Sequence, residues 1–291
     1  MGENLFFIGK GGVGKSTVSS LTAIELSQQN KVLLVSLDPA HNLSDIFNQT
    51  FSDSPKNISD NFSIIEVNIK KKVKKYLENI ENDLMKSNSS LSAFNLLNEF
   101  EIIKHSPGIE EYGILLAYEE IVNKYKNFDT IIFDMPPTAL TLKFFNLPFL
   151  SQLWINKLIN LRERIKEKKE IVSTIKLGKK TIEKDRILEK LHAQQNQYQK
   201  ICSSFKDWDI TKINLVVNQD KLSIEEGKRI IAELKNINIS IAEIYINKFD
   251  QKIEFDINNF RDSKFSYVKY SDKVLNGFEN LKTFVENNIS L

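Results

Sequence analysis

The fold of this chain is decided by nine residues, Gly9-Lys10-Gly11-Gly12-Val13-Gly14-Lys15-Ser16-Thr17. They follow the apolar run Leu5-Phe6-Phe7-Ile8 and precede a stretch, residues 18–28, in which apolar residues recur at helical spacing. A glycine-rich segment ending in Lys-Ser between a strand and a helix is the pattern of a phosphate-binding loop. We therefore expect backbone N–H groups and the positive end of the following helix to surround a phosphate here.

This loop predicts a nucleoside triphosphate site, with ATP and Mg²⁺ as its ligands. Lys15 is expected to place its charge on the β- and γ-phosphates, and the Ser16 hydroxyl to ligate Mg²⁺. The residues expected to contact the nucleotide within the loop are Gly11, Gly12, Val13, Gly14, Lys15, Ser16 and Thr17.

Composition excludes several classes of protein. The 291 residues are 41% apolar, enough for a sizeable core, and 40 basic against 38 acidic side chains leave a net charge of +2. Such a balance gives no global attraction to nucleic acid or to an acidic membrane, so we expect no nucleic-acid partner. No apolar stretch reaches the roughly 18 residues of a membrane span, and the first strand begins too early for a signal peptide, so a cytoplasmic protein is expected.

Cysteine usage argues against a disulfide or a zinc site. Cys202 is the only thiol, and the three histidines, His41, His105 and His192, are scattered. A structural zinc ion needs about four Cys or His ligands, usually in close pairs, so no zinc is expected.

Further apolar runs continue the alternation of strands and helices. They lie at residues 31–36, 130–133 and 213–217, and each is followed by a polar motif. This alternation predicts an α/β fold with a doubly wound, mainly parallel sheet. We expect a single P-loop ATPase domain over residues 1–291, with helical insertions at about 70–116 and 145–204.

The insertions leave two interpretations open. The insertion at about 145–204 has an apolar stripe at helical spacing, formed by Trp154, Leu158, Leu161 and Ile165. The insertion at about 70–116 has a similar stripe, formed by Leu91, Phe94 and Leu97. The stripes either pack within an ordinary helical subdomain or form a surface for a hydrophobic client.

The polar motifs at the strand ends carry two carboxylates. The string Asp38-Pro39-Ala40-His41-Asn42-Leu43-Ser44-Asp45, here called switch I, follows the second strand. Asp38 is placed to hold an attacking water in line with the γ-phosphate. The string Asp134-Met135-Pro136-Pro137-Thr138, here called switch II, follows the third strand, and Asp134 is placed to hold a magnesium-bound water.

These strings resemble the ATPases that comprise the arsenite-pump catalytic subunit and the soluble ATPase that delivers tail-anchored membrane proteins. The resemblance covers most of the chain. It implies a homodimer in which Lys10 reaches the partner's nucleotide, with Asp38 and Lys15 as further catalytic residues. It also implies that Asn218 reads the adenine ring through its amide, an assignment consistent with amide chemistry.

The chain also departs from that family. Ala139, Leu140 and Lys143 replace the usual Gly, His and Arg of switch II, and the Cys-x-x-Cys zinc pair of the targeting members is missing. The leading hypothesis is a homodimeric Mg-ATPase that opens and closes a helical region on a hydrophobic or tail-anchored client. An ATPase subunit of a membrane anion pump is the alternative, disfavoured by the single thiol. A partition or septum-site spatial organiser is a third, which switch I argues against.

Overall fold

The computed structural model describes residues 2–40, 42–87, 108–177, 185–253, 260 and 263–288. The chain divides into two compact units, each treated by itself below. The sheet unit comprises Met1–Phe144 and Trp208–Leu291, and the hairpin unit comprises Phe145–Asp207.

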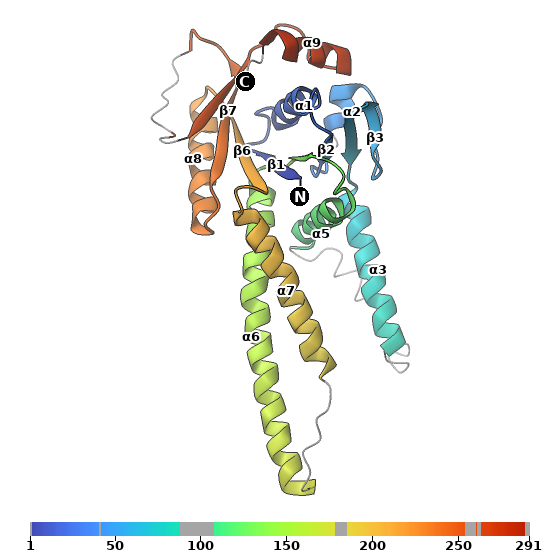
Figure 1. The fold of residues 1–291 in the computed structure, drawn as a ribbon. Coiled ribbons are helices and arrows are strands. Elements are labelled where there is room, and N and C mark those ends of the chain that lie inside the picture. Colours follow the sequence, from blue (N-terminus) through green and yellow to red (C-terminus); the bar gives the residue numbers. More distant parts are fainter. Residues whose placement is uncertain are drawn as a thin grey trace. The chain divides into compact units, whose positions relative to one another are not determined.

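Within the described residues, eight strands form one sheet in the order β3-β4-β2-β5-β1-β6-β7-β8. Figure 1 labels β1, β2, β3, β6 and β7 of this sheet. The strands are β1 (Glu3–Ile8), β2 (Val32–Ser36), β3 (Lys56–Ser59), β4 (Phe62–Glu66), β5 (Thr130–Asp134), β6 (Thr211–Asn218), β7 (Ile241–Phe249) and β8 (Lys264–Lys269). All pairs are parallel except β3 with β4. The doubly wound, mainly parallel α/β fold is thereby confirmed, and the four runs recognised in the sequence are β1, β2, β5 and β6.

Helices connect the strands. Those that lie within the sheet unit are α1 (Lys15–Leu26), α2 (Asn42–Phe47), α3 (Ile69–Ser87), α5 (Ile109–Lys124), α8 (Lys221–Asn236) and α9 (Phe278–Asn288). Helix α6 (Thr138–Leu177) begins in the sheet unit and continues in the hairpin unit, which also holds α7 (Arg186–Lys206). None of the helices in the described part of the chain combines the length and the apolar character needed to cross a membrane.

The core lies on both faces of the central strands. On one face Phe6 stacks on Phe133 with ring centroids 4.9 Å apart, and Tyr118 of α5 and Phe144 of α6 pack against them. On the other face Phe7 belongs to a buried cluster that includes residues of α1 and α9. Burial on both faces is why β1, β2 and β5 read as continuous apolar runs.

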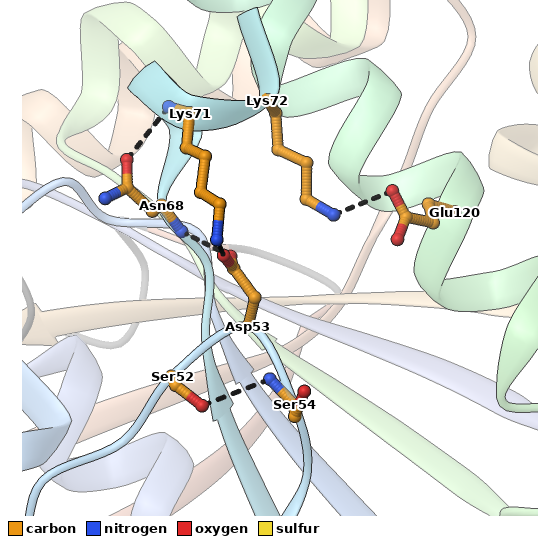
Figure 2. A network of polar contacts seen from close by, with 7 residues as sticks. All are labelled: Ser52, Asp53, Ser54, Asn68, Lys71, Lys72 and Glu120. Carbon is orange, nitrogen blue, oxygen red and sulfur yellow. Dashed lines mark hydrogen bonds and ion pairs between the residues drawn. The ribbon is translucent and has the colours of Figure 1, made fainter. Parts of the chain in front are cut away.

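Polar contacts fix the start of α3 (Figure 2). The Asn68 side chain caps the helix by accepting the Lys71 N–H at 3.0 Å, and the Asn68 N–H donates to Asp53 at 2.9 Å. Lys71 also pairs with Asp53, and Lys72 reaches Glu120 of α5 at 2.7 Å. A cap typically contributes about 1 kcal/mol and exposed ion pairs less, so the Asn68 cap is the main polar anchor of α3.

The hairpin unit consists of two helices linked along their length. Arg162 of α6 pairs with Asp185 at 2.8 Å, and Gln195 of α7 donates to Asn156 at 2.7 Å. Phe145 packs edge-on against Phe205 near the other end. Asp185 also accepts the N–H groups of Ile187 and Leu188, which caps α7. The ion pair therefore joins α6 to the first turn of α7.

The apolar stripe predicted for the second insertion lies on the exposed side of α6. Trp154, Leu158, Leu161 and Ile165 are exposed, whereas Ile155 and Ile159 are buried. The stripe predicted for the first insertion, Leu91, Phe94 and Leu97, lies outside the described residues, as do His41 and His105.

Candidate functional site

The loop between β1 and α1 has the backbone geometry that its glycines allow. Gly12 and Gly14 have φ angles of 82° and 93°, in the left-handed region that favours glycine. Gly14 is the N-cap of α1 and offers no side-chain cap to the first turn. The free N–H groups of Lys15, Ser16 and Thr17 at this helix start therefore remain available to an anion.

A buried amide supports this loop from another strand. Asn247 of β7 donates from Nδ2 to the Val13 carbonyl at 2.8 Å and is almost fully buried. A Cβ on Gly14 would collide with the same Nδ2 atom, so glycine there is required by packing as well as by φ. The sequence analysis missed Asn247, although the run Ile244-Tyr245-Ile246 that ends at this asparagine is a strand signal.

Lys15 lies at the centre of the predicted site. It is buried, and its ammonium is 3.4 Å from the Lys10 carbonyl. Burial lowers the pKa of Lys15, while the nearby carboxylates of Asp134 and Asp38 act in the opposite direction. The three charged residues expected around the phosphates are thus close enough to influence one another.

Asp134 ends β5 with a fully buried carboxylate. The pKa of Asp134 is raised to about 7, mainly by burial, and the nearby charges of Asp38 and Glu66 act in the same direction. The Ser16 hydroxyl and the Lys15 ammonium act in the opposite direction. Although Ser16 lies near, neither carboxylate oxygen forms a well-directed hydrogen bond within the described residues. Such an unpartnered buried carboxylate is costly, and a hard oxygen donor beside a serine hydroxyl is the donor set that Mg²⁺ prefers. The residues present therefore fit a magnesium ion.

Asp38 lies next to Asp134 because their strands are neighbours. Ser36 of β2 pairs in register with Asp134, and the Leu37 N–H donates to the Asp134 carbonyl at 3.0 Å. The Asp38 side chain is buried and accepts the Ala40 N–H at 3.0 Å. The structure brings Asp38, Lys15, Ser16 and Asp134 together at the carboxyl end of the sheet, where ligands bind in such folds.

A third buried carboxylate, which the sequence analysis missed, lies at the end of β4. Glu66 pairs in register with Ser36 and accepts two hydrogen bonds from Ser44, from its N–H at 2.9 Å and its hydroxyl at 2.5 Å. Ser44 belongs to switch I. The signal was present as a glutamate closing the run Phe62–Glu66, but the polar Ser63 within the run obscures the strand.

Switch II leads directly into α6, where Lys143 stands in the place of the family's usual arginine. The Lys143 ammonium is 2.8 Å from the carboxylate of Glu111, in the first turn of α5. Burial acts to raise the pKa of Glu111, but the hydrogen bond and charge of Lys143 outweigh it and lower the pKa. The thiol of Cys202 lies elsewhere, buried in α7, where burial raises its pKa to about 11.

Asn218 and Lys10 complete the predicted residues. Asn218 ends β6 in register with Asn247, and its side-chain Oδ1 is buried without a hydrogen-bond partner among the described residues. Its backbone N–H donates to the Ser223 hydroxyl at 2.9 Å. The Lys10 side chain is partly exposed and forms no hydrogen bond or ion pair with the residues that the structure describes. The structure thus leaves a donor at Lys10 and an acceptor at Asn218 unused.

Comparison with known proteins identifies the family of this chain. The family model described as anion-transporting ATPase matches residues 3–287. The putative arsenical pump-driving ATPase 2 of Aquifex aeolicus is 31% identical over 302 residues, covering 96% of each chain. The ATPase get3 of Schizosaccharomyces japonicus is 34% identical over 84% of this chain and 74% of its own length. The ATPase ASNA1 homolog of Plasmodium falciparum is 33% identical over 84% of this chain and 62% of its own length. This chain belongs to the anion-transporting ATPase family, and it hydrolyses ATP.

Proposed function

We propose that the chain works as a homodimeric, magnesium-dependent ATPase whose hydrolysis opens and closes a helical region on a hydrophobic protein client. The exposed apolar face of α6 is the observation that carries this proposal.

In the nucleotide site each charged side chain has one role. Lys15, with the loop N–H groups of residues 11–17, holds the phosphate chain. Ser16 and Asp134 hold Mg²⁺, which neutralises phosphate charge when bound. Asp38 accepts a hydrogen bond from the attacking water and keeps it in line. Its burial beside Lys15 supports that role, because a fixed carboxylate needs no reorganisation before reaction. Asn218 pairs with the adenine edge, for which its unpartnered buried oxygen provides an acceptor.

The homodimer is proposed because the Lys10 side chain has no hydrogen-bond or ion-pair partner among the residues that the structure describes. A lysine five residues before Lys15, without an ion pair among the described residues, is free to act on a second nucleotide. An arginine finger supplied in trans contributes about 10³–10⁵ in rate, and Lys10 takes the corresponding place.

The client surface is proposed on α6, within the insertion at about 145–204. Leu153, Trp154 and Leu161 are 61%, 68% and 55% exposed, an unusual state for large apolar side chains on one helix. Apolar residues that recur along one helix face bind apolar helices in many complexes. The insertions of the partner chain are proposed to complete this surface when two chains close over ATP. A tail-anchored membrane segment has the apolar chemistry that matches this surface. The resemblance to the ATPases that deliver such proteins supports the same client.

The test measures binding of an apolar transmembrane peptide to the Asp38→Asn protein with MgATP and with MgADP. Binding is expected to be tighter with ATP, and Trp154→Glu or Leu158→Glu should remove the difference while ATP affinity is unchanged. Leu222→Glu, on the exposed side of α8, is the matched control, since Leu222 is 69% exposed but lies outside the insertion. Equal binding in both nucleotide states would contradict a nucleotide-controlled client site.

An ATPase serving a membrane anion pump is the second candidate, favoured by the name of the Aquifex relative. The single thiol weighs against arsenite as the anion, because Cys202 is buried with a raised pKa and is protonated near neutral pH. We expect arsenite not to stimulate hydrolysis and purified protein to carry no stoichiometric zinc. Arsenite stimulation that is lost in Cys202→Ser would favour the pump.

A further inference from the structure

Glu66 is a buried carboxylate outside the set of residues proposed to contact ATP. Only 4% of its surface is exposed, at the end of the interior strand β4, where apolar residues would pack at lower cost. A carboxylate is retained at such a position when charge-assisted hydrogen bonds satisfy its oxygens. Ser44 supplies them, with its N–H on Oε1 and its hydroxyl on Oε2.

These two bonds tie the first turn of α2 to the end of β4. Helix α2 has six residues, too few to be stable alone, so its position depends on tertiary contacts. Leu43 and Phe47 bury their side chains in the core, and Glu66 captures the N–H and hydroxyl of Ser44 in the first turn. A negative charge at the N-terminal turn is also favoured by the helix dipole.

Switch I is consequently held at both ends. At its start, Leu37 is bonded to the Asp134 carbonyl, directly before Asp38. At its other end, Ser44 is bonded to Glu66, whose strand pairs with β2. Leu37 and Ser44 are therefore anchored to β5 and β4, the two strands that flank β2.

We infer that Glu66 is a positioning residue for ATP hydrolysis, which holds switch I through Ser44 in the place from which Asp38 orients the attacking water. The inference rests on the proposed role of Asp38. Glu66 acts through Ser44 and is not among the residues proposed to contact the nucleotide.

The experiment compares steady-state hydrolysis by Glu66→Gln, Ser44→Ala and the double variant. Glu66→Gln is expected to lower kcat about ten- to hundredfold, since displacement of a positioning group by about 1 Å has effects of that size. The KM for ATP should change less than about threefold, because the phosphate loop is untouched. Ser44→Ala should lower kcat less, and Ser44→Thr, which keeps a hydroxyl, should restore most of it. The double variant should be no worse than Glu66→Gln, because the two residues act as a unit.

Glu243→Gln is the matched control. Glu243 is likewise a buried strand carboxylate, and it accepts the Ser266 hydroxyl at 2.5 Å, but it lies on β7 away from switch I. Its substitution should leave kcat near the wild-type value. An equal loss in Glu243→Gln, or a wild-type kcat in Ser44→Ala, would overturn the inference, as would additive losses in the double variant.

Two outcomes separate this inference from the proposed function. Normal turnover by Asp38→Asn would refute the role of Asp38 and the inference with it. Normal turnover by Glu66→Gln beside an inactive Asp38→Asn would refute the inference alone. If Glu66→Gln does not fold, the kcat values of Ser44→Ala and Ser44→Thr test the inference instead, since Ser44 is partly exposed.

Discussion

At the scale of single residues, the site depends on burial of charge. Lys15, Asp38 and Asp134 are each less than 10% exposed, so their charges act through little solvent. Asp38 stands out because, among the described residues, its side chain accepts only the local hydrogen bond from the Ala40 N–H, which leaves the second carboxylate oxygen for other use.

Replacement of Asp38 by Asn should therefore separate binding from turnover. A neutral amide orients water less well and accepts no proton, so hydrolysis is expected to fall at least about a hundredfold with ATP affinity nearly intact. Rapid-quench hydrolysis and equilibrium ATP binding measure the two quantities. Asp45→Asn, an exposed acid of the same switch, should behave like the wild type. Near-normal turnover by Asp38→Asn would remove Asp38 from the catalytic residues.

The two asparagines at the ends of β6 and β7 should differ in their roles. Asn247→Ala leaves the buried Val13 carbonyl without its donor, which costs about 1–3 kcal/mol and should weaken ATP and GTP alike by about tenfold or more. Asn218→Ala should instead reduce the preference for ATP over GTP. Competition binding with both nucleotides tests this. If only the Asn247 variant loses base preference, adenine recognition belongs to Asn247 and the prediction for Asn218 is wrong.

At the scale of elements, the Glu111–Lys143 pair joins the start of α5 to the start of α6. Lys143→Met should destabilise the protein at neutral pH, because burial then raises the pKa of an unpaired Glu111. Because the pKa of Glu111 is lowered in the folded chain, its ionised carboxylate stabilises the fold at pH values above the ordinary glutamate pKa of about 4.5. This stabilisation is lost as the pH falls through the lowered pKa.

Thermal unfolding at two pH values tests this sign. The difference in melting temperature between wild type and Lys143→Met should be largest near about pH 7 and shrink near about pH 3. Lys228→Met, which breaks an exposed pair within α8, should change little at either pH. A difference that is constant with pH would show that Lys143 stabilises by packing alone.

The strands reveal why part of the fold could be predicted and part could not. β1, β2, β5 and β6 are nearly continuous apolar runs, whereas β7 places Glu243, Tyr245 and Asn247 inside and β8 is largely exposed. Polar residues in a strand are satisfied by partners distant in sequence, which a local pattern does not show. Lys15 and Ser16 were predictable because they belong to the glycine-rich loop that follows β1, and Asp38 and Asp134 because they lie in polar motifs that follow apolar runs. Asn247 and Glu66 were missed because their partners are 234 and 22 residues away.

At the scale of the whole molecule, one chain holds every proposed nucleotide contact except the one made by Lys10 of a second chain. Removing Lys10 should lower turnover without weakening ATP binding, since the lysine serves the partner's nucleotide. Removing Lys15 should abolish binding in its own site. The two variants therefore damage different halves of a shared active site.

Mixing the two inactive variants tests the shared site directly. In a mixed dimer, the Lys10→Ala chain has an intact phosphate loop, and the Lys15→Ala chain supplies an intact Lys10 to it. One of the two half-sites is then complete, so activity should reappear and peak near equal amounts of each chain.

Mixing Lys10→Ala with Asp38→Asn is a second pair, which is expected to restore activity for the same reason, because Asp38 acts in its own chain. Mixing Lys15→Ala with Asp38→Asn is the control and should not rescue, because neither chain has a complete set of its own. Absence of rescue in the first two mixtures, with heterodimers shown to form, would count against action of Lys10 across a dimer.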